Sequence, residues 1–292
     1  MCIRDSYKLS ELIYWFKTPQ KYWLNKKNIS PKEIFIHNPD EEYVSNLQKS
    51  QLITKIIQKL EIDKHNVIDD LKKLNINDQL VDNGIIIANN SIFIKEKEIK
   101  DLLESLSKSL SQHNKINRIY LKSKANKEEY FIADDTVIEL IHAKLSLSRL
   151  TEAWIKSLFI SSLNKNIKKT KVIFRTENNY KSQIIQSPGA TESNLILEEY
   201  INIFKNYSEK CLPLPPESSY KYVEAKIKSK NEKKAFTDKW IGNKNFSKGE
   251  RDNIEMKMCF GNEKEPDFFL GNNNFDQLSY RLYGPLIKAL KK

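Results

Sequence analysis

The sequence predicts a mixed α/β protein, of α+β type, in which helices flank a mixed sheet. Two observations indicate this class. Short β-branched and aromatic runs at residues 136–141 and 171–175 are separated by a helix-length segment, and two such runs can pair in parallel only through a crossover. Two further extended runs, 116–121 and 129–132, precede them with Lys-, Asn- and Asp-containing turns between, which is typical of an antiparallel meander.

Before this core the pattern is helical. Residues 8–27 predict two short helices interrupted at Pro19, because proline breaks a helix. Their aromatic side chains are interleaved with lysines and could stack bases, but a buried cluster with a lysine rim is the commoner outcome. Asp40 is placed to cap a helix over 40–60, a second helix is expected over 65–74, and residues 84–87 resemble a strand.

Apolar stripes mark the helices next to the sheet. From Glu98 the stripe consists of Ile99, Leu102, Leu103, Leu106 and Leu110. The crossover helix, over about 148–163, has a stripe wide enough to require burial against the sheet. A basic corner follows it, and its four lysines are candidates for contact with phosphate: Lys165, Lys168, Lys169 and Lys171.

The chain continues with another extended run at 180–185. Ser187-Pro188 is predicted to cap and begin a helix whose apolar residues are Leu195, Leu197, Tyr200, Ile201, Phe204 and Tyr207. The three prolines within 211–219 predict a rigid linker packed on its own domain rather than a proline-rich ligand, with a helix starting near Tyr220. Residues 242–273 are expected to be mobile, and a helix over 274–290 closes the chain.

The net charge of +11 is unevenly distributed along the chain. Residues 1–150 contribute +3 and residues 151–292 contribute +8. This excess favours an anionic partner such as nucleic acid, and a lysine-rich solvated surface is the alternative. A stretch at 225–239 surrounds Phe236 with six lysines, the second group of candidate DNA contacts: Lys226, Lys228, Lys230, Lys233, Lys234 and Lys239.

These patterns divide the chain into three parts. Residues 1–6 do not continue into the pattern that follows and are expected to be a non-native leader. Residues 7–80 form a helical N-terminal section. Residues 81–292 form the α/β domain, with its basic C-terminal half.

The sequence lacks the motifs of several kinds of functional site. The cysteines Cys2, Cys211 and Cys259 show no CxxC spacing, which argues against a zinc site or a disulfide framework and fits the reducing cytoplasm. No phosphate-binding loop and no membrane-length apolar run occurs. We therefore expect no metal, no cofactor and no membrane contact. The histidines are dispersed: His37, His65, His113 and His142.

Acidic residues beside the predicted strands raise the hypothesis of a nuclease. Two or three carboxylates and a lysine can bind Mg²⁺ and position a water molecule, and the pattern is an Asp on one strand with Glu-x-Lys on the next. Here Asp134 and Asp135 fall in a turn, and Glu139 is followed by Lys144 only five residues later. The spacing fails, so no catalytic residues are predicted.

At this point the order of features resembles a known family. The helix 144–159, the strand 172–175, the helix 190–207 and the string 212–219 are similar to the C-terminal region of the RecC (gamma) subunit of exodeoxyribonuclease V. The segments 9–25 and 278–286 resemble the two ends of the same region. The resemblance implies a PD-(D/E)xK nuclease-like fold that has lost its catalytic residues.

The resemblance also implies a role. In that family the subunit holds and splits duplex DNA and guides a single strand, while RecB-type and RecD-type partner subunits supply ATP hydrolysis and cleavage. We therefore expect a DNA-guiding and subunit-docking module of a helicase–nuclease for recombinational repair of double-strand breaks. Two alternatives are an active Mg²⁺-dependent nuclease using Asp134, Asp135, Glu139 and Lys144, and a purely structural interaction domain.

Overall fold

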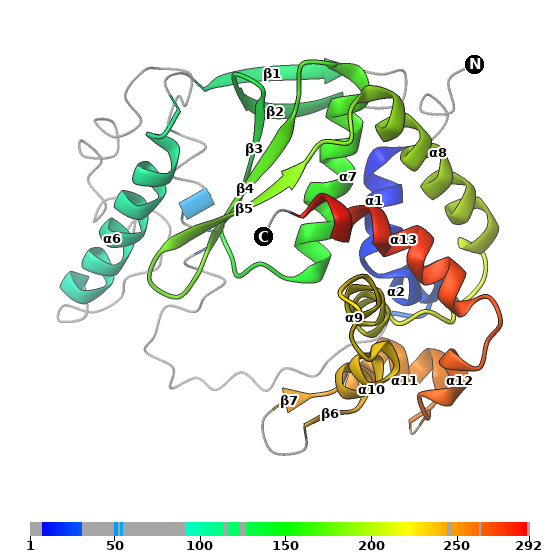
Figure 1. Ribbon diagram of the computed structural model, residues 1–292. Helices are drawn as coiled ribbons and strands as arrows, with labels where there is room; N and C mark the ends of the chain where they lie inside the picture. Colours follow the sequence, from blue (N-terminus) through cyan, green and yellow to red (C-terminus); the bar gives the residue numbers. More distant parts are fainter. Residues whose placement is uncertain are drawn as a thin grey trace.

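A computed structural model describes residues 8–30, 50–51, 53–54, 92–113, 116–122, 127–243, 247–262 and 264–290 of the chain (Figure 1). The predicted helix 65–74 and strand 84–87 lie outside these residues. Of the predicted helix 40–60 only residues 50, 51, 53 and 54 are described, and all four are helical.

A five-stranded mixed sheet forms the centre, in the order β1-β2-β3-β4-β5. The strands β1 (Asn117–Lys122), β2 (Lys127–Ala133) and β3 (Thr136–Ile141) are an antiparallel meander. The helix α7 (Leu147–Leu163) then crosses over to β4 (Lys169–Arg175), which pairs with β3 in parallel, and β5 (Tyr180–Gln186) returns antiparallel. The predicted fold class and crossover are confirmed.

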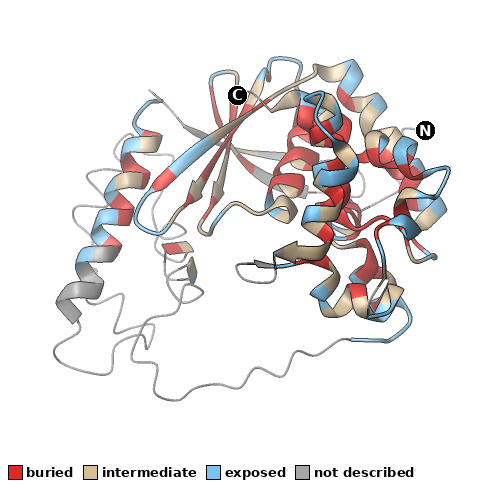
Figure 2. Cartoon of the chain, turned by 60° about the horizontal axis from the view of Figure 1, so that its bottom comes forward, coloured by how far each residue is buried: buried red, intermediate tan, exposed pale blue. Residues whose placement is uncertain are grey.

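The two faces of the sheet have separate cores because side chains alternate along each strand. On one face lies α6 (Ile92–Leu110), whose buried leucines pack against Ala133, Ile138 and Ile173. The other face is covered by α7, α8 (Ala190–Tyr207) and α13 (Phe275–Ala289) (Figure 1). Figure 2 shows the buried residues along the inner sides of these helices. The helix α6 begins before the predicted Glu98 but carries the predicted stripe.

The N-terminal helices α1 (Leu9–Lys17) and α2 (Pro19–Lys26) join the larger core. Trp15 packs edge-on against Phe204 of α8, and the ring centroids of Phe16 and Tyr200 are 4.7 Å apart. Both predicted helices and their break at Pro19 are therefore confirmed, and these aromatic side chains are core. The predicted division of the chain at residues 80–81 falls outside the described residues and stays a prediction.

Three expectations in the C-terminal half need correction. The helix α8 begins after Gly189, not at Ser187, whose hydroxyl instead accepts a hydrogen bond from the Gly189 N–H. Leu195 is 60% exposed because it lies on the outer face of α8. The helix α9 (Pro216–Ile227) starts four residues before Tyr220, directly on Pro216.

The proline-rich linker packs on its own domain, as predicted. Leu212 and Leu214 are buried, and the buried Gln20 amide donates to both of their carbonyls, at 2.8 and 3.1 Å.

Beyond α9, residues 242–273 contain packed elements rather than a wholly mobile stretch. The helix α10 (Glu232–Ile241) is followed by the short hairpin β6 (Gly242–Asn243) and β7 (Ser247–Lys248), the 3₁₀ turn η2 (Glu250–Asp252), α11 (Ile254–Phe260) and α12 (Asp267–Leu270). The side chain of Phe269 is fully buried against Phe236 and Trp240 of α10. The closing helix α13 continues through Pro285.

Candidate nucleic-acid interface

The six predicted lysines of 225–239 lie on α9, α10 and the turn between them, and they divide into two groups. Three are neutralised by carboxylates: Lys226 by Asp276 at 2.5 Å, Lys228 by Glu224 at 2.6 Å, and Lys239 by Glu217. The other three are exposed and have no ion pair with any described residue: Lys230, Lys233 and Lys234. This second group, the free lysine cluster, is the part available to an anion.

The buried side of α10 holds the free lysine cluster in place. Phe236 and Trp240 are almost completely buried, and the Trp240 indole donates to the Lys264 carbonyl at 2.7 Å. At the start of α10 the Asn231 side chain accepts from the Lys234 N–H at 2.9 Å. Lys233 and Lys234 are therefore carried by a capped and anchored helix, and Lys230 lies in the turn just before it.

The four lysines of the basic corner after α7 also differ in their exposure and contacts. Lys165 is exposed and Lys169 half-buried, and neither has an ion pair with a described residue. Lys168 is mostly exposed and lies 3.7 Å from Asp135. Lys171 is only 7% exposed, and its ammonium donates to the Ser109 carbonyl and the Gln112 side chain at the end of α6. Lys171 thus points into the protein and does not present its ammonium to an external anion.

The two basic groups lie in different parts of the molecule. The N-terminal end of α7, at Leu147 and Ser148, shares a cleft with the start of α9. The corner at 165–169 follows the other end of this 17-residue helix, about 25 Å away at 1.5 Å per residue. Any nucleic acid that contacts both groups therefore has to run along the domain.

The four residues of the nuclease hypothesis do not converge. Asp134 and Asp135 lie in the turn before β3, Lys144 lies beyond its other end, and Lys144 pairs with Glu177 at 2.8 Å. Glu139 lies within the strand, on the face covered by α7, and its carboxylate accepts from the Lys156 ammonium at 2.8 Å. Among the described parts of the chain, no three His, Cys, Asp or Glu side chains gather into a potential metal site.

Glu139 belongs to a chain of ion pairs between β3, α7 and α1. Lys156 also contacts Glu152 at 3.1 Å, and Glu152 in turn binds Lys17 at 2.6 Å. Burial alone would lower the pKa of Lys156, but the two carboxylates outweigh it and raise that pKa. Burial would likewise raise the pKa of Glu152, yet Lys17 and Lys156 lower it. Lys156 and Glu152 are therefore held in their charged forms.

Two further contacts were not visible in the sequence. His142 hydrogen-bonds the Tyr180 hydroxyl at 2.9 Å, and burial together with the charge of Arg175 lowers the pKa of His142 to about 4. Cys211 and Cys259, 48 positions apart, are free thiols, and the Cys259 thiol, together with burial, raises the pKa of Cys211. Sequence spacing does not reveal either contact, because each joins separate elements.

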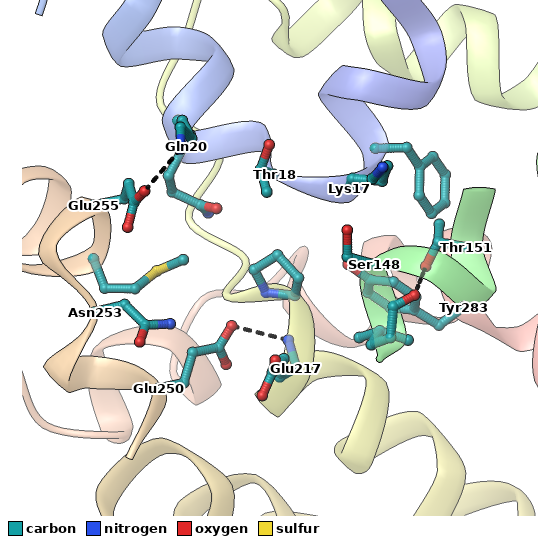
Figure 3. Close-up of a pocket in the computed structure, with 15 residues that line it drawn as sticks. Lys17, Thr18, Gln20, Ser148, Thr151, Glu217, Glu250, Asn253, Glu255 and Tyr283 are labelled. Carbon is teal, nitrogen blue, oxygen red and sulfur yellow. Dashed lines mark hydrogen bonds and ion pairs between the residues drawn. The ribbon is translucent and has the colours of Figure 1, made fainter. Parts of the chain in front are cut away.

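A cleft of about 140 Å³ lies where α1, α2, α7, α9 and α11 meet (Figure 3). At one side Glu250 accepts hydrogen bonds from the Glu217 and Ser218 N–H groups, at 2.9 and 2.7 Å, and from the Ser218 hydroxyl at 2.6 Å. These N–H groups begin α9, so Glu250 caps that helix from 32 residues away. A carboxylate from a later segment thus supplies the cap that the N-cap residue Pro215 does not provide.

Comparison with known proteins identifies the central part of the chain. Residues 95–227 match the family model described as the RecC C-terminal domain. This stretch is a RecC C-terminal domain. It comprises nearly all of α6, the five-stranded sheet, α7, α8 and α9. No curated protein sequence gives a match to the chain.

The RecC C-terminal domain points to a subunit role in the RecBCD complex of DNA repair, whose members work with one another and with DNA. The matched residues include the basic corner and the first lysines of α9, but end before the free lysine cluster. The similarity that we expected for segments 9–25 and 278–286 lies outside the match. None of the helices in the described ranges has the length and apolar character of a membrane span.

Proposed function

We propose that this chain is a non-catalytic DNA-guiding and subunit-docking module of the exodeoxyribonuclease V helicase–nuclease, acting in recombinational repair of double-strand breaks in the cytoplasm. Its partners would be duplex or forked DNA, a single strand, and the RecB-type and RecD-type subunits. The observation that carries the proposal is the engagement of Glu139, the strand carboxylate of the nuclease pattern, by Lys156.

This contact argues against metal chemistry for a physical reason. A carboxylate that binds Mg²⁺ has to offer its oxygens to the ion together with further oxygen ligands. The Glu139 carboxylate faces an ammonium group instead, and residue 141, where Glu-x-Lys requires lysine, is the buried Ile141. Asp134 and Asp135 lie in the turn before the strand. Supplying a catalytic centre would therefore require several substitutions.

The fold supports the same proposal. The order of α6, three meander strands, the crossover helix α7 and a parallel β4 fits a PD-(D/E)xK-like domain without its catalytic residues. For the DNA-guiding part we propose the free lysine cluster and the corner lysines Lys165, Lys168 and Lys169. Phosphate contacts by such side chains position nucleic acid without reading its sequence, which suits a guiding surface.

A cleavage assay tests the non-catalytic part. The full chain is incubated with linear duplex and single-stranded DNA in Mg²⁺ or Mn²⁺, beside Glu139→Ala. We expect no cleavage by either protein. Cleavage that Glu139→Ala abolishes would instead establish the active-nuclease alternative.

Salt-dependent binding tests the interaction with DNA. Binding of forked DNA is measured from low to high salt for the full chain, alone and with its partner subunits. Alanine at Lys230, Lys233 and Lys234 should weaken binding and reduce the salt slope by about 0.7–0.9 for each phosphate that is no longer neutralised. The matched control replaces Lys226, Lys228 and Lys239, which carry the same formal charge but are ion-paired.

The control variant should lose much less affinity than the test variant. Co-purification with the partner subunits, combined with unchanged DNA affinity in both lysine variants, would favour the purely structural alternative. Absence of DNA binding in every assembly contradicts the DNA-guiding part altogether.

A further inference from the structure

A second basic surface, separate from the predicted lysines, lies at the carboxyl ends of the parallel strands. Since β3 and β4 run in parallel, the segment after Ile141 and the turn after Arg175 meet at one edge of the sheet. Between them is a shallow groove of about 480 Å³, which we call the strand-end groove. Ligands of open α/β sheets commonly bind at such edges.

The strand-end groove is predominantly cationic. Its lining includes the side chains of Lys144, Arg175 and Lys181 and one carboxylate, Glu177. A further cation is adjacent, because the guanidinium of Arg149 donates to the Lys144 carbonyl at 2.8 Å. Glu177 pairs with Lys144, so Lys181 and the adjacent Arg149, which have no ion pair with a described residue, add positive charge that no carboxylate of the lining balances.

The cations at the groove differ in how deeply they are buried. Arg175 is 4% exposed and lines the inner part, and its charge contributes to the low pKa of His142 behind it. Lys181, in the lining, and Arg149, beside it, are exposed and have no ion pair with a described residue. A buried cation below and solvated cations above form a graded positive field.

We propose that the strand-end groove binds the sugar-phosphate backbone of a DNA strand. The groove is open rather than enclosed, which suits an extended polyanion, and the exposed amide of Asn178 adds a donor at its wall. The inference rests on the proposed function and deepens it by naming the phosphate contacts. The lysines of α9 and α10 are not part of this surface.

Two variants test the groove, one expected to weaken DNA binding and the other to strengthen it. Arg149→Ala with Lys181→Ala removes two exposed cations, so affinity of the full chain for a labelled single strand should fall about tenfold and the salt slope by about 1.4. Glu177→Gln removes the groove's carboxylate and releases Lys144, so binding should tighten by about twofold or more. Fluorescence anisotropy across a salt series measures both, with and without the partner subunits.

The matched control is Lys210→Ala, because Lys210 is exposed just after α8. The C-terminal end of α8 lies away from the β4–β5 turn (Figure 1). This variant should leave affinity nearly unchanged. If the free lysine cluster variant weakens binding but the groove variants do not, the groove inference is wrong and the proposed function stands. If the groove variants bind DNA as tightly as wild type but no longer bind the partner subunits, the groove is a protein-docking surface and the inference is wrong. If wild type binds no DNA in any assembly, both proposals fail.

Discussion

At the scale of single residues, Glu250 is the most informative side chain. It is 3% exposed, yet its carboxyl group accepts three hydrogen bonds at the start of α9. Burial dominates over these bonds and raises the pKa of Glu250 to about 7 from the ordinary 4.5. The native protein therefore binds a proton at Glu250 more readily than the unfolded chain does.

The sign of the pH effect follows from this difference. Between pH 4.5 and about 7 the native state retains a proton that the unfolded state has released, so the free energy of unfolding falls as pH rises. The loss from this group is at most about 3 kcal/mol. We expect wild type to lose stability over this window relative to Glu250→Gln, which cannot titrate. Urea unfolding at pH 5, 6 and 7 measures the difference.

Two results would count against this account. Parallel stability curves for wild type and Glu250→Gln would mean that the pKa of Glu250 is not raised. Glu250→Ala provides the control for the cap itself, since it removes the acceptor at all pH values and should destabilise the protein by about 1–2 kcal/mol at pH 5. An unchanged stability in Glu250→Ala would mean that the cap does not stabilise α9.

At the scale of elements, the contact between α6 and β4 explains why Lys171 differs from its basic neighbours. The Lys171 ammonium donates to the Ser109 carbonyl at 3.1 Å and to Gln112 at 2.6 Å, and so satisfies a carbonyl group in the last turn of α6. Burial, and then the charge of Lys169, lowers the pKa of Lys171. Its role is to hold a helix end to the sheet.

Lys171→Met therefore should affect α6 and leave DNA affinity unchanged. The methionine retains the apolar stem but cannot donate, so amides in the last turn of α6 should exchange faster with solvent. We expect the protein to lose about 1–3 kcal/mol of stability. Hydrogen exchange and anisotropy measure the two effects. Lys169→Met is the adjacent control, and an equal loss of DNA affinity in both variants would contradict the assignment.

Helices and strands were predictable from the sequence where the local residue pattern agrees with the burial of those residues in the fold. The meander, the crossover helix and the break at Pro19 all follow from periodicity and turn chemistry. The start of α9 was misplaced because its cap, Glu250, comes from a later segment. Lys171 resembled its exposed neighbours because only the register of β4 turns it toward α6.

The candidate site was predictable only in part for the same reason. The lysines of 225–239 are visible as a run, but which are ion-paired depends on partners such as Asp276, 50 residues away. The strand-end groove combines Arg175 of β4 with Lys181 of β5, and Arg149 of α7 lies beside it. Only the parallel pairing of β3 with β4 brings these elements to one edge.

At the scale of the whole molecule, one buried tyrosine connects four helices. The hydroxyl of Tyr200 accepts from the Trp154 indole at 3.0 Å and donates to the Leu282 carbonyl at 2.9 Å, and its ring packs on Phe16. These contacts join α7, α8, α13 and α1. The first and last described helices of the chain are therefore parts of one core.

Tyr200→Phe keeps the ring but leaves the Trp154 N–H and the Leu282 carbonyl buried without these partners. Each unsatisfied group costs about 1–3 kcal/mol, so we expect a loss of about 2–4 kcal/mol in the free energy of unfolding. The urea midpoint should fall while the slope stays constant. Tyr207→Phe, at the half-buried end of α8, is the control and should change stability by no more than about 0.5 kcal/mol.

The same experiment tests whether the core is one cooperative unit. Tryptophan fluorescence reports on Trp15, Trp23, Trp154 and Trp240, which lie in α1, α2, α7 and α10, while far-ultraviolet circular dichroism reports on the helices as a whole. Because Tyr200 links the N-terminal helices to the sheet layer, both signals should shift together in Tyr200→Phe. A fluorescence transition that moves while the dichroism transition stays would show that the N-terminal helices unfold separately.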